Sequence, residues 1–189
     1  IAADWIGDPV RLLYSHVLIP GTKNTTADLA WLRAKGLDTW IQRQHAAGAT
    51  VIGVCGGYQM LGQSVLEDGR THQGLALLPV ETVMRADKTV RQVAGTLNGT
   101  PFDAYEIHVG QTTTPLNAVP FAFVDGRPEG IRYNRCIGTY LHDALRADCV
   151  LAELGLAAEP AHRPDASYDQ LAEWFAAHAD IRLFEDQYL

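Results

Sequence analysis

The chain has few of the features that mark secreted, membrane-spanning or nucleic-acid-binding proteins. Its 189 residues include only three cysteines, Cys55, Cys136 and Cys149, without CxxC spacing, so neither a disulfide framework nor a zinc knuckle is expected. No apolar run approaches the ~18 residues needed to cross a bilayer, and no basic-then-apolar leader opens the chain. Asp and Glu (22) outnumber Lys and Arg (15), which form no cluster able to neutralise phosphates. We therefore expect a cytoplasmic protein that binds neither membrane nor nucleic acid.

Two further patterns are missing, and they concern ligands. None of the seven histidines occurs in HxxxH or HxH spacing, which metal-binding elements commonly show. The nucleotide-binding pattern GxxxxGK[ST] is also absent. We expect no metal and no cofactor on this chain.

What the sequence does contain is the composition of a folded domain, with 47% hydrophobic and 20% charged residues. Short apolar runs at Val10–Tyr14, Val17–Ile19 and Val51–Val54 predict buried strands. Only Ser15 and His16 separate the first two runs.

Helices are predicted between these strands. Thr25 and Asp28 form a capping-box pattern that favours a helix start, and Gly36 ends that helix. Asp38 is expected to cap a second helix that ends at Gly48, and a third is expected over Gln59–Ser64. Strands separated by helices of this length predict βαβ units, hence an α/β fold with a mostly parallel sheet.

The middle of the chain has a different residue pattern. Between roughly Leu75 and Val124, strand-like segments alternate with Gly, Pro, Asn or Asp, which predicts a β-rich and antiparallel excursion. The predicted strands are Leu75–Met84, Thr89–Leu97, Tyr105–Val109 and Phe121–Val124.

The last part of the chain again has the pattern of strands followed by helices. Turns at Asp125–Gly126 and Glu129–Gly130 lead to a short strand over Ile131–Tyr133. Cys136–Leu141 predicts another buried strand, which ends at His142. A helix over Asp143–Leu154, a loop over Pro160–Ala166 and a closing amphipathic helix over Tyr168–Ala179 complete the prediction.

The strongest chemical signal is Gly53-Val54-Cys55-Gly56-Gly57, at the end of a predicted strand and before a predicted helix. This is the context of a nucleophile elbow, with Cys in place of Ser. Glycines make room for the sharp turn, the helix N-terminus favours thiolate, and the N–H of Gly56 is free to bind an oxyanion. A buried structural cysteine is the alternative, and we favour the nucleophile.

A thiol nucleophile needs a base. His142 is the first choice because it follows a strand, where the functional side chains of α/β folds gather. His108 is the rival, although a histidine within a strand more often supports a neighbouring carboxylate. The other histidines fit surface positions, except His16, which we leave unassigned; these are His45, His72, His162 and His178.

The segment Gly21–Thr25 has two possible roles. Backbone N–H groups at a helix start attract anions, so the segment could bind phosphate, although the spacing makes this weak. If it lies beside the elbow, the same N–H groups complete an oxyanion hole with Gly56.

Four motifs, in one order along the chain, together resemble the cobyric acid synthase family, in particular its C-terminal class I glutamine amidotransferase domain. The resemblance runs from about Val10 through the closing helix. The motifs are Ile19–Thr25, Val54–Gly62, Tyr105–Thr112 and Gly138–His142.

The resemblance implies a three-layer, flavodoxin-like α/β domain over residues 1–189 that performs the glutaminase half of an amidation. Cys55 would attack the side-chain amide of glutamine and His142 would relay protons, while Gly56 with Gly21 or Thr22 would hold the oxyanion. It further implies that Gln59 helps to hold glutamine. Glu106 and His108 are possible supporting residues.

The resemblance also implies partners. An N-terminal synthetase domain, absent from this chain, would bind ATP, Mg²⁺ and the corrinoid whose peripheral carboxylates are amidated with the released ammonia. That domain is expected to cover the mouth of the site.

The chain departs from the pattern in three places. Ala144 stands where many class I amidotransferases have the Glu of a triad, so a third member is missing or comes from elsewhere. Asp143 replaces a common Gly after the histidine. The connection between Tyr14 and Val17 is shorter than the family's.

Other functions remain open at this point. The acceptor could differ, as in cobyrinic acid a,c-diamide synthesis or amidation of a cell-wall lipid intermediate. A stand-alone cysteine hydrolase would act without glutamine preference, and a silent docking domain would tolerate Cys55→Ala.

Overall fold

The computed structural model describes residues 3–156, 170–171, 173–174 and 177, in two compact units. One unit is Ala2–Gly155, and Ile1 with Leu156–Leu189 forms the other. In the second unit, the described residues between 170 and 177 are helical. The predicted loop over Pro160–Ala166, His162, His178 and the rest of the closing helix lie outside the described residues. The helices and strands that carry the candidate site all belong to the first unit.

A four-stranded sheet forms the α/β part of this unit. Its order is β1 (His16–Ile19), β2 (Thr50–Val54), β10 (Cys136–Thr139) and β9 (Ile131–Tyr133). The first three strands are mutually parallel and β9 is antiparallel. Every residue of β10 is buried, as is β2 after Thr50, which explains their continuous apolar sequence. The predicted mostly parallel sheet is confirmed.

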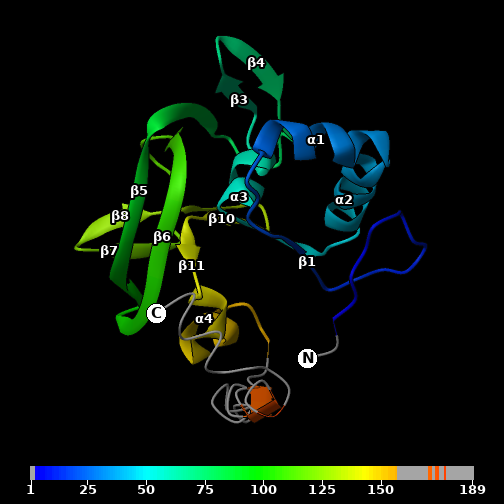
Figure 1. Cartoon of the computed structure of the whole chain (residues 1–189). Coiled ribbons are helices and arrows are strands. Elements are labelled where there is room, and N and C mark those ends of the chain that lie inside the picture. The colour runs from blue at the N-terminus through cyan, green and yellow to red at the C-terminus, as the bar shows by residue number, and fades with distance from the viewer. Residues whose placement is uncertain (1–2, 157–169, 172, 175–176, 178–189) are drawn as a thin grey trace. The chain divides into compact units, whose positions relative to one another are not determined.

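Three helices accompany this sheet (Figure 1). They are α1 (Thr25–Ala34), α2 (Leu37–Ala46) and α3 (Gly56–Leu61). The N-cap of α1 is Asn24, one residue before the predicted Thr25, and its side chain accepts a hydrogen bond from the N–H of Ala27 at 3.0 Å. Gly36, with a φ of 72°, both turns the chain after α1 and starts α2, so Asp38 is not the cap.

The β-rich excursion is a second, largely antiparallel sheet, dominated in Figure 1 by the long green hairpin of two strands. Those strands are β5 (Glu81–Leu97) and β6 (Thr100–Thr113), paired antiparallel with a bulge between Met84 and Thr89. The prediction of a β-rich antiparallel middle is confirmed. The remaining strands are β3 (Ser64–Glu67), β4 (Arg70–Gln73), β7 (Ala122–Val124), β8 (Arg127–Glu129) and β11 (Leu141–His142).

Two local predictions in this region are wrong. The third helix begins at Gly56 and ends at Leu61, and Ser64 already belongs to the unpredicted hairpin of β3 and β4. Leu75–Leu78 is irregular, because β5 starts only at Glu81.

The predicted first strand, Val10–Tyr14, is also wrong. This segment runs beside α2, held by side chains of that helix: Trp40 Nε1 donates to the Val10 carbonyl at 2.8 Å and Gln44 Nε2 to the Leu12 carbonyl at 2.7 Å. Side-chain bonds thus replace the ladder of a strand. Because no strand precedes β1, the segment between Tyr14 and Val17 does not connect two strands. Its short length is therefore not a departure from the family's connection between strands.

The predicted strand Cys136–Leu141 divides between the two sheets. β10 ends at Thr139 in the parallel sheet, and β11 pairs with β6, so that Leu141 faces Glu106 and His142 faces Tyr105 in the register. The following helix is broken as well, into a 3₁₀ turn (Ala144–Arg146) and α4 (Asp148–Glu153), because Ala147 is extended. This change of sheet places His142 next to the β-rich part.

Candidate active site

Cys55 occupies a sharp turn between β2 and α3. Its φ of 53° is unusual for a residue with a side chain, and its N–H donates to the Thr139 carbonyl at 2.8 Å. A methyl group at Gly57 would lie 2.0 Å from the Ile19 carbonyl oxygen, and one at Gly53 would lie 2.6 Å from the Gly57 carbonyl carbon. Only glycines fit on either side of the cysteine, so the strand–turn–helix geometry of a nucleophile elbow is present.

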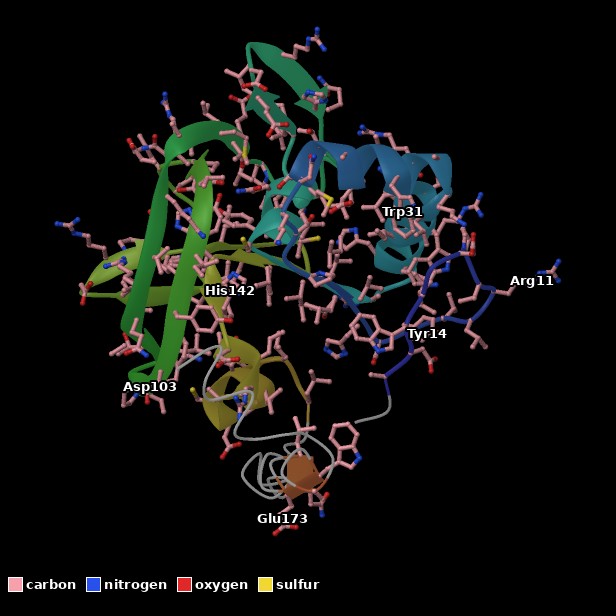
Figure 2. All side chains as sticks on the ribbon, viewed as in Figure 1. Arg11, Tyr14, Trp31, Asp103, His142 and Glu173 are labelled. Carbon is pink, nitrogen blue, oxygen red and sulfur yellow. The ribbon has the colours of Figure 1, made fainter. Side chains whose placement is uncertain are left out.

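His142 belongs to β11, in the other sheet (Figure 2). Gly21 lies between the two side chains: a methyl group there would be 3.3 Å from His142 Cε1 and 3.4 Å from Cys55 Cβ. The structure therefore brings Cys55, His142 and Gly21 together, although 86 residues lie between the cysteine and the histidine in the chain. The chemistry available to a thiol beside an imidazole is nucleophilic attack assisted by a base.

Burial controls the protonation of this pair. It raises the pKa of the Cys55 thiol, and the hydrogen bond from the Gly56 backbone opposes this only in part. Burial also lowers the pKa of His142. Both effects favour a neutral thiol beside a neutral imidazole and oppose the preference for thiolate at the helix start. The imidazole is ready to accept a proton when the thiol reacts.

A backbone carbonyl serves both side chains. The Cys55 thiol donates to the Ile107 carbonyl oxygen at 3.3 Å, and a hydrogen bond to the same backbone raises the pKa of His142 against the effect of burial. The Nε2 atom of His142 is buried without a hydrogen-bond partner among the described residues. Sequence analysis missed Ile107 because a main-chain acceptor has no residue signature.

The predicted oxyanion donors lie side by side. A methyl group at Gly56 would be 3.0 Å from the Thr22 backbone nitrogen and 2.2 Å from Thr22 Cγ2. The Thr22 hydroxyl bonds to Asp28, which anchors the segment to the first turn of α1. Because this segment contacts the elbow through Gly21 and Thr22, its position favours an oxyanion hole over a separate phosphate site.

Gln59 is placed behind the nucleophile, in a buried hydrogen-bonded chain. Its Oε1 accepts from the Thr25 hydroxyl at 2.6 Å, and its Nε2 donates to the Tyr140 hydroxyl at 3.2 Å. Tyr140 continues the chain to Thr112 at 2.6 Å. Both ends of the Gln59 amide have protein partners, which hold it in the wall of the site behind Cys55.

Glu106 and His108 extend from β6 with their own partners. Glu106 is buried and bonds to Arg91. The His108 ring stacks on Tyr140 with 3.9 Å between centroids, and its Nδ1 lies 2.8 Å from the Gly110 carbonyl oxygen. These contacts fit supporting positions, while His142 is the histidine that shares Gly21 with Cys55.

Two further side chains at the site were not singled out from the sequence. Tyr105 stacks on His142, with 5.0 Å between ring centroids and 10° between planes. Glu129, 8% exposed, bonds to the segment that leads to His142. Tyr105 could have been found from its place in the Tyr-Glu-Ile-His motif. Glu129 gave only a turn signal, because its neighbour is a glycine.

Two histidines outside the site bond to backbone carbonyls. His16 Nε2 lies 2.8 Å from the Leu154 carbonyl oxygen, and His45 bonds to the Asn134 carbonyl.

Known proteins are similar to this chain in sequence. Residues 7–149 match the CobB/CobQ-like glutamine amidotransferase domain. A cobyric acid synthase of Cereibacter sphaeroides is 42% identical over 93% of this chain, which spans 40% of that protein. A cobyric acid synthase of a Jannaschia species is 43% identical over 87% of the chain, which spans 37% of that protein. The chain thus has well under half the length of these curated relatives.

Solved structures agree on the fold. A glutamine amidotransferase crystal structure has a TM-score of 0.59 at 14% identity, covering 75% of this chain and 80% of that one. PurLQS from Thermotoga maritima has a TM-score of 0.57 at 13% identity, covering 78% and 81%. With the family match over most of the chain, and with a cysteine elbow beside a histidine, the chain belongs to the CobB/CobQ-like glutamine amidotransferase family.

Proposed function

We propose that this domain hydrolyses glutamine to glutamate and ammonia, through a thioester on Cys55. The observation that carries the proposal is that Cys55 and His142 lie on either side of Gly21, next to the backbone donors of Thr22 and Gly56. A thiol, a base and an oxyanion hole are the three parts that acyl transfer needs.

The reaction follows from this geometry. His142 takes the thiol proton as Cys55 Sγ attacks the side-chain carbonyl of glutamine, and the N–H groups of Gly56 and Gly21 or Thr22 stabilise the oxyanion. The carbon–nitrogen bond then breaks, and the proton on His142 leaves with ammonia. Water, deprotonated by His142, attacks the thioester and releases glutamate and the free thiol. Gln59 supports the substrate from behind, through the chain that it forms with Thr25 and Tyr140.

The use of the ammonia is inferred from the relatives. Both are cobyric acid synthases, of which this chain spans about 40%. We propose that the domain supplies ammonia to an ATP-dependent synthetase domain that holds Mg²⁺ and amidates the carboxylates of a corrinoid. The family description also includes CobB-like members, so a,c-diamide formation is the second candidate for the same ammonia.

A surface beside the site suits such a partner. Val90, Tyr105 and Ile107 lie on one face of the β5–β6 hairpin, and their side chains are 62%, 38% and 37% exposed. Ammonia that escapes into water is protonated, so a synthetase domain docked over this face would keep it reactive.

A free thiol nucleophile also requires a reducing compartment, which is why we propose the cytoplasm. None of the described helices is long and apolar enough to cross a membrane.

The proposal is tested by measuring glutamate and ammonia released from glutamine by this chain. We expect equal amounts of both from the unchanged chain, and a loss of roughly 10³-fold or more in kcat with Cys55→Ala or His142→Ala. Asparagine, one methylene shorter, is the control substrate. Release that survives Cys55→Ala, or equal rates with asparagine, would overturn the proposal.

A further inference from the structure

His142 must be held at a fixed position relative to Cys55. The Glu that completes a triad in many class I amidotransferases is missing here. The residue two positions after His142 is Ala144, so the position that holds the triad Glu in many class I amidotransferases has no carboxylate. The chain has just left one sheet for the other, between Thr139 in β10 and Leu141 in β11. Something must fix this crossing.

A buried carboxylate from β8 fixes it. Glu129 Oε1 accepts a hydrogen bond from the Tyr140 N–H at 2.8 Å, and its Oε2 accepts one from the Thr139 hydroxyl at 2.7 Å. The Thr139 hydroxyl in turn accepts from the Leu141 N–H at 3.0 Å. Three consecutive residues before His142 therefore depend on one side chain.

The same segment holds the nucleophile. The Thr139 carbonyl accepts from the Cys55 N–H at 2.8 Å, and the Tyr140 hydroxyl binds Gln59 one turn after Cys55. The bonds of Glu129 thus reach both halves of the pair: the backbone of Cys55 through Thr139, and the backbone of His142 through Leu141.

We infer that Glu129 is the positioning residue of this site, a carboxylate that holds the crossing between β10 and β11 so that His142 meets Cys55. It acts through Thr139 and Tyr140 and not by contact with the imidazole. The inference rests on the proposed glutaminase function and adds to it an acidic group in place of the one that position 144 lacks.

The chemistry of the site explains why a carboxylate stands there. Both partners of Glu129 are donors, an N–H and an O–H, and the ionised carboxylate accepts from both. The amide of Glu129→Gln keeps one acceptor and can donate to the Thr139 hydroxyl, which leaves the hydroxyl proton without its partner. Glu129→Ala loses both bonds and leaves the buried Tyr140 N–H unsatisfied.

The test compares glutamine hydrolysis by Glu129→Gln, Glu129→Ala and Thr139→Val, each checked for native circular dichroism and thermal unfolding. Glu81→Ala, an exposed glutamate of β5, is the control. We expect Glu129→Ala to lower kcat about 10²-fold with KM changed less than about threefold, as a misplaced base would. Glu129→Gln and Thr139→Val should each lose about tenfold, and the double variant no more than the worse single one, because both remove the same bond.

Chemical rescue adds a readout that general loss of structure would not show. A cavity of about 400 Å³ is lined by Glu129, Glu106 and Arg91, which gives a small anion a way to the vacated position. Formate should restore part of the kcat of Glu129→Ala and have no effect on Glu129→Gln, where the side chain fills the space.

The outcomes separate this inference from the proposed function. If the unchanged chain hydrolyses glutamine and folded Glu129→Ala keeps kcat within twofold, the inference is wrong while the function stands. Independent effects of Glu129→Gln and Thr139→Val would also contradict it. If the unchanged chain is inactive, the function fails, and the NMR signals of the His142 ring still decide the inference: they should shift in Glu129→Ala and remain in Glu81→Ala.

Discussion

At the scale of single residues, two glycines at the site serve different purposes. Gly21 makes room for the reacting side chains, and Gly57 makes room for the backbone. Gly21 leaves space for Cys55 and His142, with 3.4 and 3.3 Å to a methyl group placed there. Gly57 leaves space for the main chain of β1, where a methyl group would lie 2.0 Å from the Ile19 oxygen. The first contact is close and the second is impossible without movement of the backbone.

Alanine at these positions should therefore have different effects. We expect Gly21→Ala to fold normally and to lower glutaminase kcat about tenfold, because the methyl group crowds the reacting pair. Gly57→Ala should lower the free energy of unfolding by ~3 kcal/mol or more. Gly7→Ala, where nothing lies within 4 Å, is the control for both measurements. Full activity of Gly21→Ala, or normal stability of Gly57→Ala, would show that the packing around the elbow is not as described.

Glu129 also predicts how stability depends on pH. Burial raises the pKa of this carboxyl from 4.5 to about 7, against the hydrogen bonds from Tyr140 and Thr139, and the nearby charge of Glu106 adds to the increase. Between these two pH values the folded chain holds a proton that the unfolded chain has released, so stability falls as pH rises from 4.5 to 7.

Urea unfolding of the unchanged chain and of Glu129→Gln between pH 4.5 and 8 measures this effect. The difference in unfolding free energy should change by about 3 kcal/mol in favour of Glu129→Gln as pH rises, because the amide does not titrate. Parallel curves for the two proteins would mean that the carboxyl is not buried as found.

The residues that could be predicted from the sequence are those whose side chains have a characteristic reactivity. Cys55 stands in a glycine pattern that only an elbow requires, and His142 follows an apolar strand, so their meeting could be predicted. Ile107 and Glu129 could not, because one acts through a main-chain atom and the other through a strand, β8, whose neighbour in space is set by the tertiary fold.

At the scale of elements, the buried strands were predictable and the segments held by side chains were not. β2 is apolar after Thr50 because both faces are covered. Val10–Tyr14 is apolar except for Arg11, yet Leu12 and Leu13 are 64% and 74% exposed. Composition alone cannot distinguish a strand that pairs from a segment that is fastened to a helix by Trp40 and Gln44.

The strand Cys136–Leu141 shows the same limit. Its apolar pattern continues across the point where the chain changes sheets, and nothing local marks Thr139 as the end. The change depends on Glu129, ten residues earlier, and on β6, which receives β11.

The hydrogen bonds that hold the segment Val10–Tyr14 against α2 can be tested directly. Trp40→Phe removes the indole N–H that binds the Val10 carbonyl, and should cost about 1 kcal/mol of stability. Arg11, which projects from this segment in Figure 2, should then be cut by trypsin severalfold faster. Trp31→Phe, on α1 and 46% exposed, is the matched control. Equal cleavage rates in both variants would contradict this role of α2.

At the scale of the whole molecule, the two sheets have separate tasks. The parallel sheet carries Cys55 at the carboxyl end of β2, and the antiparallel sheet supplies His142 on β11 and the Ile107 carbonyl on β6. The site exists only where the sheets meet, so it forms when both are folded. The α/β class and the β-rich excursion were visible in the sequence, while the meeting of the sheets follows from long-range pairing that no local pattern records.

The central claim is that Cys55 is a nucleophile formed for glutamine. The most direct measurement is the intact mass of this chain after incubation with a glutamine-mimicking diazoketone, alone and with excess glutamine, beside Cys55→Ala. We predict one covalent adduct, suppressed by glutamine and absent from Cys55→Ala. An adduct that persists in Cys55→Ala, or labelling that glutamine does not slow, would contradict the account.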